Sequence, residues 1–271
     1  MAWKEMKYDK YKKETVDNEV SIIRDACSYI LKLKPSFLPI VEPLGFFAEE
    51  QEAKAYLVME YCEGGDLQKY IQDMKKSGSL ISKALSFIEQ LLSSVNQIHQ
   101  NNIIHGDLKP QNILLSKDKK IKLADFGLAQ QLQAGKTHKT SHLAGTMNFI
   151  APELFQVAGK SQIIIYKISA DIWACGIILY ELLSQQHPFL LDQIGIPDEE
   201  LIRRVINDEP PELPSQYPES MRNLIKSMLI KDPKDRITAA DALKELKILI
   251  NQQNPNLSIP AHLQKNKVNR T

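Results

Sequence analysis

The 271-residue sequence has few cysteines, no long apolar run and almost no net charge. Its three cysteines, Cys27, Cys62 and Cys175, are odd in number and far apart, which argues against a disulfide framework or a zinc knuckle and predicts free thiols in the core. No apolar run approaches the roughly 18 residues of a membrane helix, and the first twenty residues are too rich in charge for a signal peptide. We therefore expect a cytoplasmic or nuclear protein with no membrane partner.

The formal net charge of +1 results from 34 Lys and Arg residues mixed with 33 Asp and Glu residues. Binding to nucleic acid through its phosphates requires a sustained basic face, which this pattern does not provide. No nucleic-acid partner is therefore expected. At this length the chain can bury a large core and fits one large domain or a two-lobed one.

The first third of the sequence mixes strands with one helix. Residues 2–7 and 54–60 are apolar enough to be strands, while apolar residues at helical spacing predict a helix from Thr15 to Leu33. From Leu80 onward, apolar residues at intervals of three and four predict a long amphipathic helix. This helix ends just before the segment HGDLKPQN, which must therefore lie on a loop.

The remaining chain is expected to be helical after a short hairpin. Strands are predicted at Ile113–Leu115 and Ile121–Leu123, followed by a polar stretch to about Ala151 and then by helices to the end. Asp171–Leu183 is apolar nearly all round, which predicts a buried central helix. Further helices are expected around 198–207, 219–230 and 238–250, the last with a capping box formed by Thr238 and Asp241. Residues 251–271 are polar and predict a frayed tail.

The segment HGDLKPQN, residues 105–112, carries groups that suit phosphate transfer. Asp107 can accept a proton from an attacking hydroxyl, Lys109 can neutralise phosphate charge, and Asn112 can hold a divalent metal. The same residues are also common in solvated turns. The motif Asp125-Phe126-Gly127 follows directly after a predicted strand, where its carboxylate can take a metal ion that bridges two phosphates.

Taken in order, the motifs of this chain resemble those of eukaryotic protein kinases of the serine/threonine type. Besides HGDLKPQN and DFG, the matching segments are AWKEM at 2–6, LVMEYCEGGDL at 57–67, GTMNFIAPE at 145–153, DIWACG at 171–176 and KDPKDR at 231–236. The resemblance covers about residues 2–250. It implies an α+β, two-lobed fold with a small β-rich lobe at about 1–60 and a large, mainly helical lobe at about 64–250.

The resemblance also implies a role for each matching residue, with ATP and Mg²⁺ as cofactors and proteins as substrates. The implied catalytic residues are Asp107, Lys109 and Thr146, and the implied metal ligands are Asn112 and Asp125. The implied ATP-binding residues are Lys4, Glu19, Met59, Glu60, Cys62, Asp66 and Leu114. The implied structural residues are His105, Phe126, Gly127, Glu153, Asp171 and Arg236.

Some of these roles are more specific. Lys4 would bind the α and β phosphates with Glu19 as its ion-pair partner, and Arg236 would pair with Glu153. Met59 would be the gatekeeper, Glu60 and Cys62 would contact adenine through their backbone, and Asp66 would lie near the ribose. Lysine at position 109 together with threonine at 146 accompanies serine and threonine acceptors in the family.

The start of the chain departs from the family's pattern. Kinases carry a glycine-rich hairpin before the strand with the phosphate-binding lysine, whereas Met1 lies only three residues before Lys4. We expect an N-terminally incomplete kinase domain, either a fragment or a mis-assigned start, that binds Mg-ATP weakly and has little activity by itself. A naturally lidless binding module is the alternative.

Gly106 is the second departure, because most kinases regulated through the activation segment carry arginine there. That arginine pairs with a phosphate added to the segment. Without it, a phosphate on Thr137, Thr140 or Ser141 lacks its main partner, unless another cation such as Lys122 or Lys12 replaces it. We expect this non-RD segment to be ordered by its own packing or by a partner protein.

Two other functions remain open. A catalytically weak pseudokinase or scaffold would share the same fold. Small-molecule phosphotransferases resembling aminoglycoside and choline kinases also carry an HGD loop that ends in asparagine, but they lack the GT…APE segment and the DIWACG helix. The stretch between Glu153 and Asp171 is longer than usual and contains IIIYK, which we interpret as a packed insertion.

Overall fold

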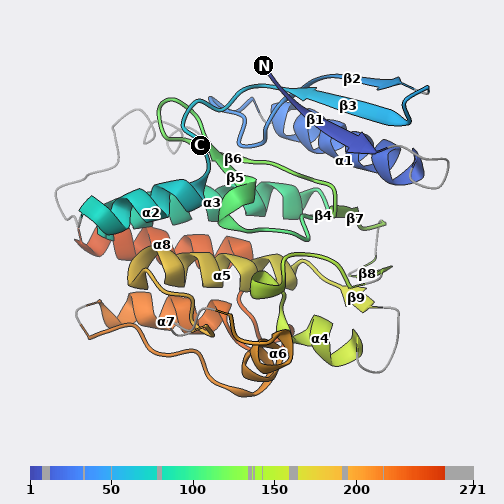
Figure 1. Cartoon of the computed structure of the whole chain (residues 1–271). Coiled ribbons are helices and arrows are strands. Elements are labelled where there is room, and N and C mark those ends of the chain that lie inside the picture. The colour runs from blue at the N-terminus through green and yellow to red at the C-terminus, as the bar shows by residue number, and fades with distance from the viewer. Residues whose placement is uncertain are drawn as a thin grey trace, which may run out of the picture.

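The computed structural model describes residues 1–7, 13–32, 34–49, 51–77, 81–133, 136, 138–141, 143–158, 164–190, 195–215 and 217–253. A small sheet and one helix form an upper lobe, and a larger helical body forms the lower lobe (Figure 1). The expected α+β, two-lobed architecture is confirmed.

The small lobe is a three-stranded antiparallel sheet with a helix packed beside it. Its strands are β1 (Ala2–Lys7), β2 (Pro43–Glu49) and β3 (Lys54–Met59), in the order β1-β3-β2. Helix α1 (Lys13–Lys32) lies under the sheet in Figure 1. The predictions of β1, β3 and α1 are confirmed within a few residues. The sequence analysis missed β2 because most of its side chains are partly or fully exposed, so no apolar alternation marks it.

The large lobe is built around one buried helix, α5 (Ser169–Ser184), as its apolar sequence predicts. Helix α5 packs against α3 (Ile81–Gln100) and α7 (Glu219–Met228), and α3 packs against α8 (Ala239–Gln253). The remaining helices are α2 (Leu67–Ser77), α4 (Pro152–Ala158) and α6 (Asp198–Asn207). The α6, α7 and α8 predictions are confirmed, and α8 extends to Gln253, three residues into the predicted tail. Residues 254–271 lie outside the described part of the chain.

Three short strand pairs connect these helices. They are β4 (Ile103–Ile104) with β7 (Gln130–Gln131), β5 (Ile113–Leu115) with β6 (Ile121–Leu123), and β8 (Lys139–Ser141) with β9 (Ile164–Tyr166). Two 3-10 helices, η1 (Pro110–Asn112) and η2 (Met147–Phe149), complete the secondary structure. The β5-β6 hairpin was predicted correctly.

The expectation that everything after Ala151 is helical is wrong at β9. The run IIIY is rich in β-branched residues, which favour strands, and β8 supplies its antiparallel partner. A strand of three residues cannot be recognised from periodicity without knowledge of that partner. Among the described residues of this insertion, Ile164–Tyr166 thus form a strand that pairs with β8.

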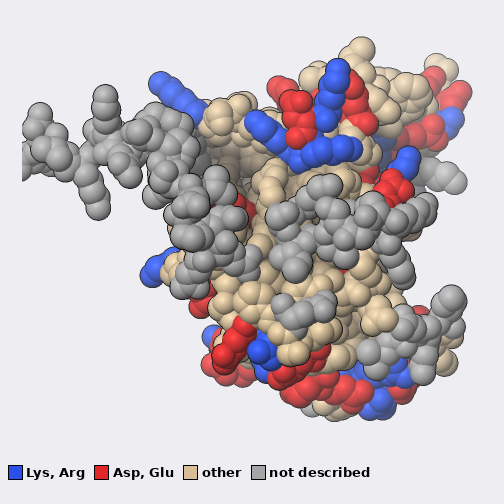
Figure 2. All heavy atoms as spheres, turned by 90° about the vertical axis from the view of Figure 1, so that its left-hand side faces the viewer, with Lys and Arg blue, Asp and Glu red and all other residues tan. Residues whose placement is uncertain are grey.

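The cap of α8 and the cysteines agree with the sequence predictions. Thr238 Oγ1 accepts a hydrogen bond from the Asp241 N–H at 3.2 Å, as an N-cap residue should. Cys27, Cys62 and Cys175 are free and buried. No helix within the described residues is long and apolar enough to cross a bilayer. On the face shown in Figure 2, basic and acidic side chains lie side by side.

His187 is a buried histidine that couples folding to pH. Its Nε2 donates to the Asn148 carbonyl at 2.9 Å, and its Nδ1 accepts the Phe189 N–H at 3.1 Å, which assigns a neutral ring. Burial lowers the pKa of His187 to about 4, although the Asn148 carbonyl acts in the opposite direction. The unfolded chain therefore takes up the proton first as the pH falls, and the folded state loses stability below the ordinary histidine pKa of about 6.5.

We predict that the His187 contribution to the free energy of unfolding falls by about 2 kcal/mol between pH 7 and pH 5. Burial also raises the pKa of Glu181 to about 7, which stabilises the fold over the same descent in pH. Only the difference between wild type and His187→Gln therefore isolates the histidine. Urea unfolding of both proteins at pH 7 and pH 5 measures it, with the exposed His138→Gln as control. Parallel losses in wild type and His187→Gln would contradict the prediction.

Candidate functional site

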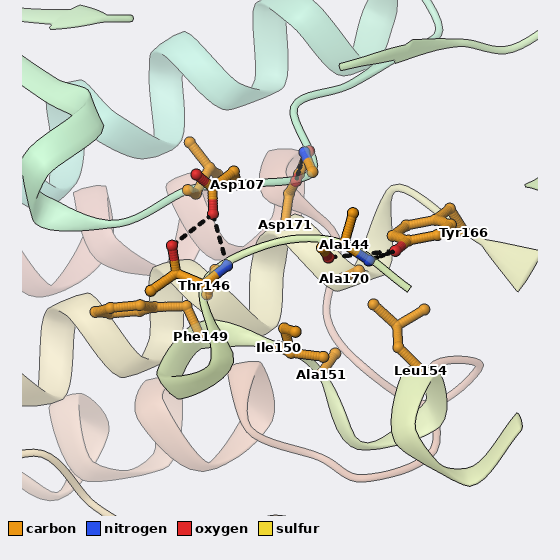
Figure 3. A pocket seen from close by; sticks show the side chains of 13 residues that line it. Asp107, Ala144, Thr146, Phe149, Ile150, Ala151, Leu154, Tyr166, Ala170 and Asp171 are labelled. Carbon is orange, nitrogen blue, oxygen red and sulfur yellow. Dashed lines mark hydrogen bonds between the residues drawn. The ribbon is translucent and has the colours of Figure 1, made fainter. Parts of the chain in front are cut away.

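Asp107 lies at the centre of a hydrogen-bonded cluster on the loop between β4 and β5. The Thr146 N–H and hydroxyl both donate to Asp107 Oδ1 at 2.8 Å (Figure 3). Lys109 Nζ lies 2.8 Å from Asp107 Oδ2 and 2.7 Å from Thr146 Oγ1. The structure thus brings together the three residues predicted to be catalytic, which are 39 positions apart at most.

Asn112 closes the same cluster from the end of η1. Its Nδ2 donates to the Asp107 carbonyl oxygen at 2.9 Å and to Asp107 Oδ2 at 3.0 Å. Among the described residues, nothing donates a hydrogen bond to Asn112 Oδ1, although the residue is buried. The amide oxygen is therefore available as a ligand for a cation.

Asp125 meets residues from the small lobe. Lys4 Nζ lies 2.7 Å from Asp125 Oδ1 and 2.8 Å from Glu19 Oε1, so β1, α1 and the DFG motif converge on one ammonium group. Burial opposes the charge of Lys4, but the hydrogen bonds that its ammonium donates to Asp125 and Glu19 outweigh burial and raise the pKa of Lys4. Burial likewise opposes the charge of Asp125, yet Lys4 holds the pKa of Asp125 below its ordinary value. Lys4 and Asp125 are therefore both charged at neutral pH.

Asp125 also has an unusual backbone conformation. Its φ of +59° lies in the left-handed region, which non-glycine residues seldom adopt. The Gly127 N–H lies 3.4 Å from Asp125 Oδ1. Backbone strain of this kind tends to occur at functional sites, and here it accompanies the side chain that projects toward Lys4.

Asp171 holds the backbone of the HGDLKPQN segment, residues 105–112, which we call the catalytic loop after its predicted role. At the start of α5 it accepts the N–H groups of His105 at 2.9 Å and Gly106 at 3.0 Å. His99 Nε2 lies 2.8 Å from Asp171 Oδ2 and comes from the end of α3. Burial would raise the pKa of Asp171, but its contacts with His99 and the loop lower it overall. The sequence analysis named Asp171 and His105 but missed His99, because nothing local distinguishes a histidine at the end of a helix.

His105 connects the catalytic loop with the DFG motif. Its Nε2 donates to the Ala124 carbonyl at 3.0 Å, and its ring lies 4.8 Å from that of Phe126. Both side chains are fully buried, and burial lowers the pKa of His105, so the ring is neutral. The two residues predicted to be structural therefore pack directly beneath Asp125.

Glu153 and Arg236 form the predicted ion pair of the large lobe. The two guanidinium nitrogens of Arg236 donate to the two carboxylate oxygens of Glu153, each at 2.8 Å. Arg236 also donates to the Ser169 carbonyl at 2.8 Å, which links α4 to the start of α5. Its side chain is completely buried.

The connection between the lobes carries the residues expected to bind adenine and ribose. Met59 ends β3, and in the described part of the chain neither the Glu60 carbonyl nor the Cys62 N–H makes a backbone hydrogen bond. Both groups are therefore free for a ligand. Asp66 caps α2 through the Lys69 N–H at 2.8 Å and pairs with Leu114 as an isolated bridge, so these two predicted residues lie together.

Lys122 takes a place that the sequence analysis did not foresee. Its Nζ lies 2.5 Å from Glu60 Oε1 and 3.0 Å from the Leu38 carbonyl, at the connection between the lobes. It is therefore not the cation that replaces arginine at position 106. The other suggested cation, Lys12, lies outside the described residues. The sequence offered one clue to this ion pair, because a lysine within a fully buried strand requires an acidic or polar partner.

The donor set at Asn112 and Asp125 suits Mg²⁺. In the described residues no group of three or more His, Cys, Asp or Glu side chains could hold a metal by itself. One carboxylate and one amide oxygen are hard ligands, and Mg²⁺ is typically held by one or two such groups together with waters and substrate phosphates. The two residues thus fit an ion that arrives with a nucleotide.

Comparison with known proteins agrees with this geometry. Residues 1–246 match the family model described as Protein kinase domain. The chain is 37% identical over 199 residues to Serine/threonine-protein kinase RUNKEL from Arabidopsis thaliana, covering 73% of this chain and 14% of that protein. It is 38% identical over 189 residues to Carbon catabolite-derepressing protein kinase from Secale cereale, covering 70% and 35%. It is 34% identical over 197 residues to Rhodopsin kinase GRK1 from Homo sapiens, covering 72% and 34%. The chain thus matches about a third or less of the length of these relatives.

Proposed function

Because the chain belongs to the protein kinase domain family, we propose that it transfers the γ-phosphoryl group of Mg-ATP to serine or threonine hydroxyls of protein substrates. The observation that supports this most is the position of Asp107 between Thr146, Lys109 and Asn112. Its carboxylate is held by four donors, so it is oriented before a substrate binds. Such preorganisation is what phosphoryl transfer requires of a protein.

In this proposal Asp107 accepts a hydrogen bond from the substrate hydroxyl and takes its proton as the oxygen attacks phosphorus. Lys109, which lies beside the same carboxylate, stabilises charge on the transferred group. Lys4 carries a positive charge for the α and β phosphates, because Glu19 and Asp125 keep it ionised. Mg²⁺, when bound through Asp125 and Asn112, would neutralise charge on the phosphate oxygens.

The residues at positions 109 and 146 support serine and threonine over tyrosine as acceptors. Lys109 and Thr146 are in direct contact at 2.7 Å, and the relatives named above include one whose name specifies serine/threonine-protein kinase. The rival proposal is a pseudokinase that binds partners without turnover. Against it, every charged group of the proposed mechanism is present and paired.

The direct test is phosphate transfer from radiolabelled ATP by the purified chain. We expect incorporation into peptides with serine or threonine acceptors, no incorporation when tyrosine replaces them, and dependence on added Mg²⁺. Mass spectrometry of the product should identify the modified residue. Magnesium-dependent nucleotide binding without any transfer would favour the pseudokinase.

Asp125→Ala should weaken Mg-ATP binding by at least about tenfold, equivalent to roughly 1.4 kcal/mol, because it removes a metal ligand. Without Mg²⁺ the variant should bind ATP no worse than wild type, since the carboxylate that competes with phosphate for Lys4 is gone. Calorimetric titration with and without EDTA measures both affinities. Asp118→Ala, on the exposed turn between β5 and β6, is the control. An equal loss in EDTA would contradict a metal role.

A further inference from the structure

The strand pair β8-β9 joins residues 139–141 to the residues that precede α5. Residues 139–141 lie between the DFG motif and the APE sequence, in the stretch that we call the activation segment. Its register places Lys139 opposite Tyr166, Thr140 opposite Ile165 and Ser141 opposite Ile164. Strand β8 lies shortly before Thr146 in the chain, and β9 lies shortly before Asp171. The strand pair therefore joins two stretches of chain whose following residues, Thr146 and Asp171, contact the catalytic loop.

Tyr166 makes the closest polar contact across this junction. Its hydroxyl accepts the Ala144 N–H at 2.8 Å and lies 3.3 Å from the Ala144 carbonyl oxygen, to which it can donate (Figure 3). The residue is only 2% exposed. Burial raises the pKa of Tyr166, although the Ala144 N–H opposes this, so the hydroxyl keeps its proton at neutral pH. The N–H and the carbonyl of Ala144 thus both contact the neutral hydroxyl of Tyr166.

Only Gly145 separates Ala144 from Thr146. Its φ of +115° is a conformation that side chains rarely allow, so the turn between the two residues is set by the backbone. Thr146 then makes two hydrogen bonds to Asp107 Oδ1. A displacement of Ala144 would therefore move the donors that orient the carboxylate.

The stretch of chain that carries Tyr166 also holds the backbone next to Asp107. Asp171, five residues after Tyr166, binds the N–H groups of His105 and Gly106. Tyr166, Gly106, Ala144, Thr146 and Asp171 line one small cavity of about 20 Å³ together with Asp107. The residues from β9 into α5 thus contact both the activation segment and the catalytic loop.

We propose that Tyr166 is a positioning residue for Asp107, acting through Ala144 and Thr146, and that β8-β9 pairing orders this part of the activation segment without a phosphate. The proposal rests on the proposed function for its catalytic consequence. It also gives a physical basis for Gly106, since a segment held by strand pairing and a buried hydroxyl does not require a cation at that position.

The test compares Tyr166→Phe with Tyr217→Phe. Tyr217 is also buried, and its hydroxyl donates to the Leu183 carbonyl at 2.7 Å, at the end of α5 opposite to Asp171, so each variant removes one buried tyrosine hydroxyl. We expect kcat to fall about tenfold for Tyr166→Phe alone, with the Kd for Mg-ATP unchanged. Thermal melting should shift to a similar extent in both variants. Loss of kcat in both, or in neither, would overturn the proposal.

Hydrogen exchange provides a readout that needs no activity. Amides of residues 143–147 should exchange at least about tenfold faster in Tyr166→Phe than in wild type or Tyr217→Phe. In Tyr166→Phe, local opening of this segment no longer has to break the hydrogen bonds between Ala144 and the Tyr166 hydroxyl. If the wild-type chain transfers no phosphate, the proposed function fails but this measurement still decides the positioning claim. Unchanged exchange in Tyr166→Phe would overturn it.

Discussion

Asp107→Asn should lower kcat by about 10²- to 10⁴-fold and leave nucleotide binding nearly unchanged. Asparagine keeps the size of the side chain and can still accept hydrogen bonds from Thr146, but it cannot take a proton from the substrate hydroxyl. The loss should therefore appear in the chemical step. Calorimetric titration with Mg-ATP and a single-turnover transfer assay measure the two effects separately.

Asp118→Asn is the matched control for this variant, because Asp118 is exposed on the β5-β6 turn. It should keep wild-type turnover. Retention of normal turnover by Asp107→Asn would show that the proposed base is wrong. A comparable loss in ATP affinity would instead mean that the substitution disturbs the nucleotide site.

Arg236→Ala should cost about 3 to 5 kcal/mol of unfolding free energy, which is typical for removing one partner of a buried ion pair. The variant leaves the Glu153 carboxylate without its bidentate partner and removes the Arg236 donor from three backbone carbonyls. For a domain of this size, such a loss corresponds to a fall in Tm of roughly 10 °C. Urea unfolding monitored by tryptophan fluorescence suits the measurement, since Trp173 lies beside Arg236.

Arg203→Ala supplies the comparison. Arg203 also pairs with two carboxylates, Glu200 and Asp208, but half of its side chain is exposed, so we expect a much smaller loss of stability than at Arg236. Glu153→Gln is a milder second variant if Arg236→Ala does not fold, and it should be destabilised by less. A cost at position 236 no greater than that at 203 would contradict a structural role for the buried pair.

The amino-acid sequence was sufficient to predict the candidate site residues of HGDLKPQN and DFG and the longer helices. HGDLKPQN holds Asp107, Lys109 and Asn112 within five positions of each other, so this set of candidate residues can be recognised locally. Helices such as α3 and α5 bury a face or their whole surface, and this leaves a periodic apolar pattern. The hairpin of β5 and β6 was predictable because two short apolar runs flank one polar turn, SKDKK.

The tertiary structure alone decided which distant groups meet. Lys4 and Asp125 are 121 positions apart, and their contact depends on how β1 is placed over the large lobe. Lys122 could have been assigned to several acidic partners, and only the packing of β6 against residues 38–40 brings it to Glu60. Strand β9 could not be assigned from its β-branched residues alone, because so short a strand is stabilised by its partner β8. The role of the Tyr166 hydroxyl was likewise unpredictable, because it depends on the Ala144 amide and carbonyl that the hydroxyl contacts.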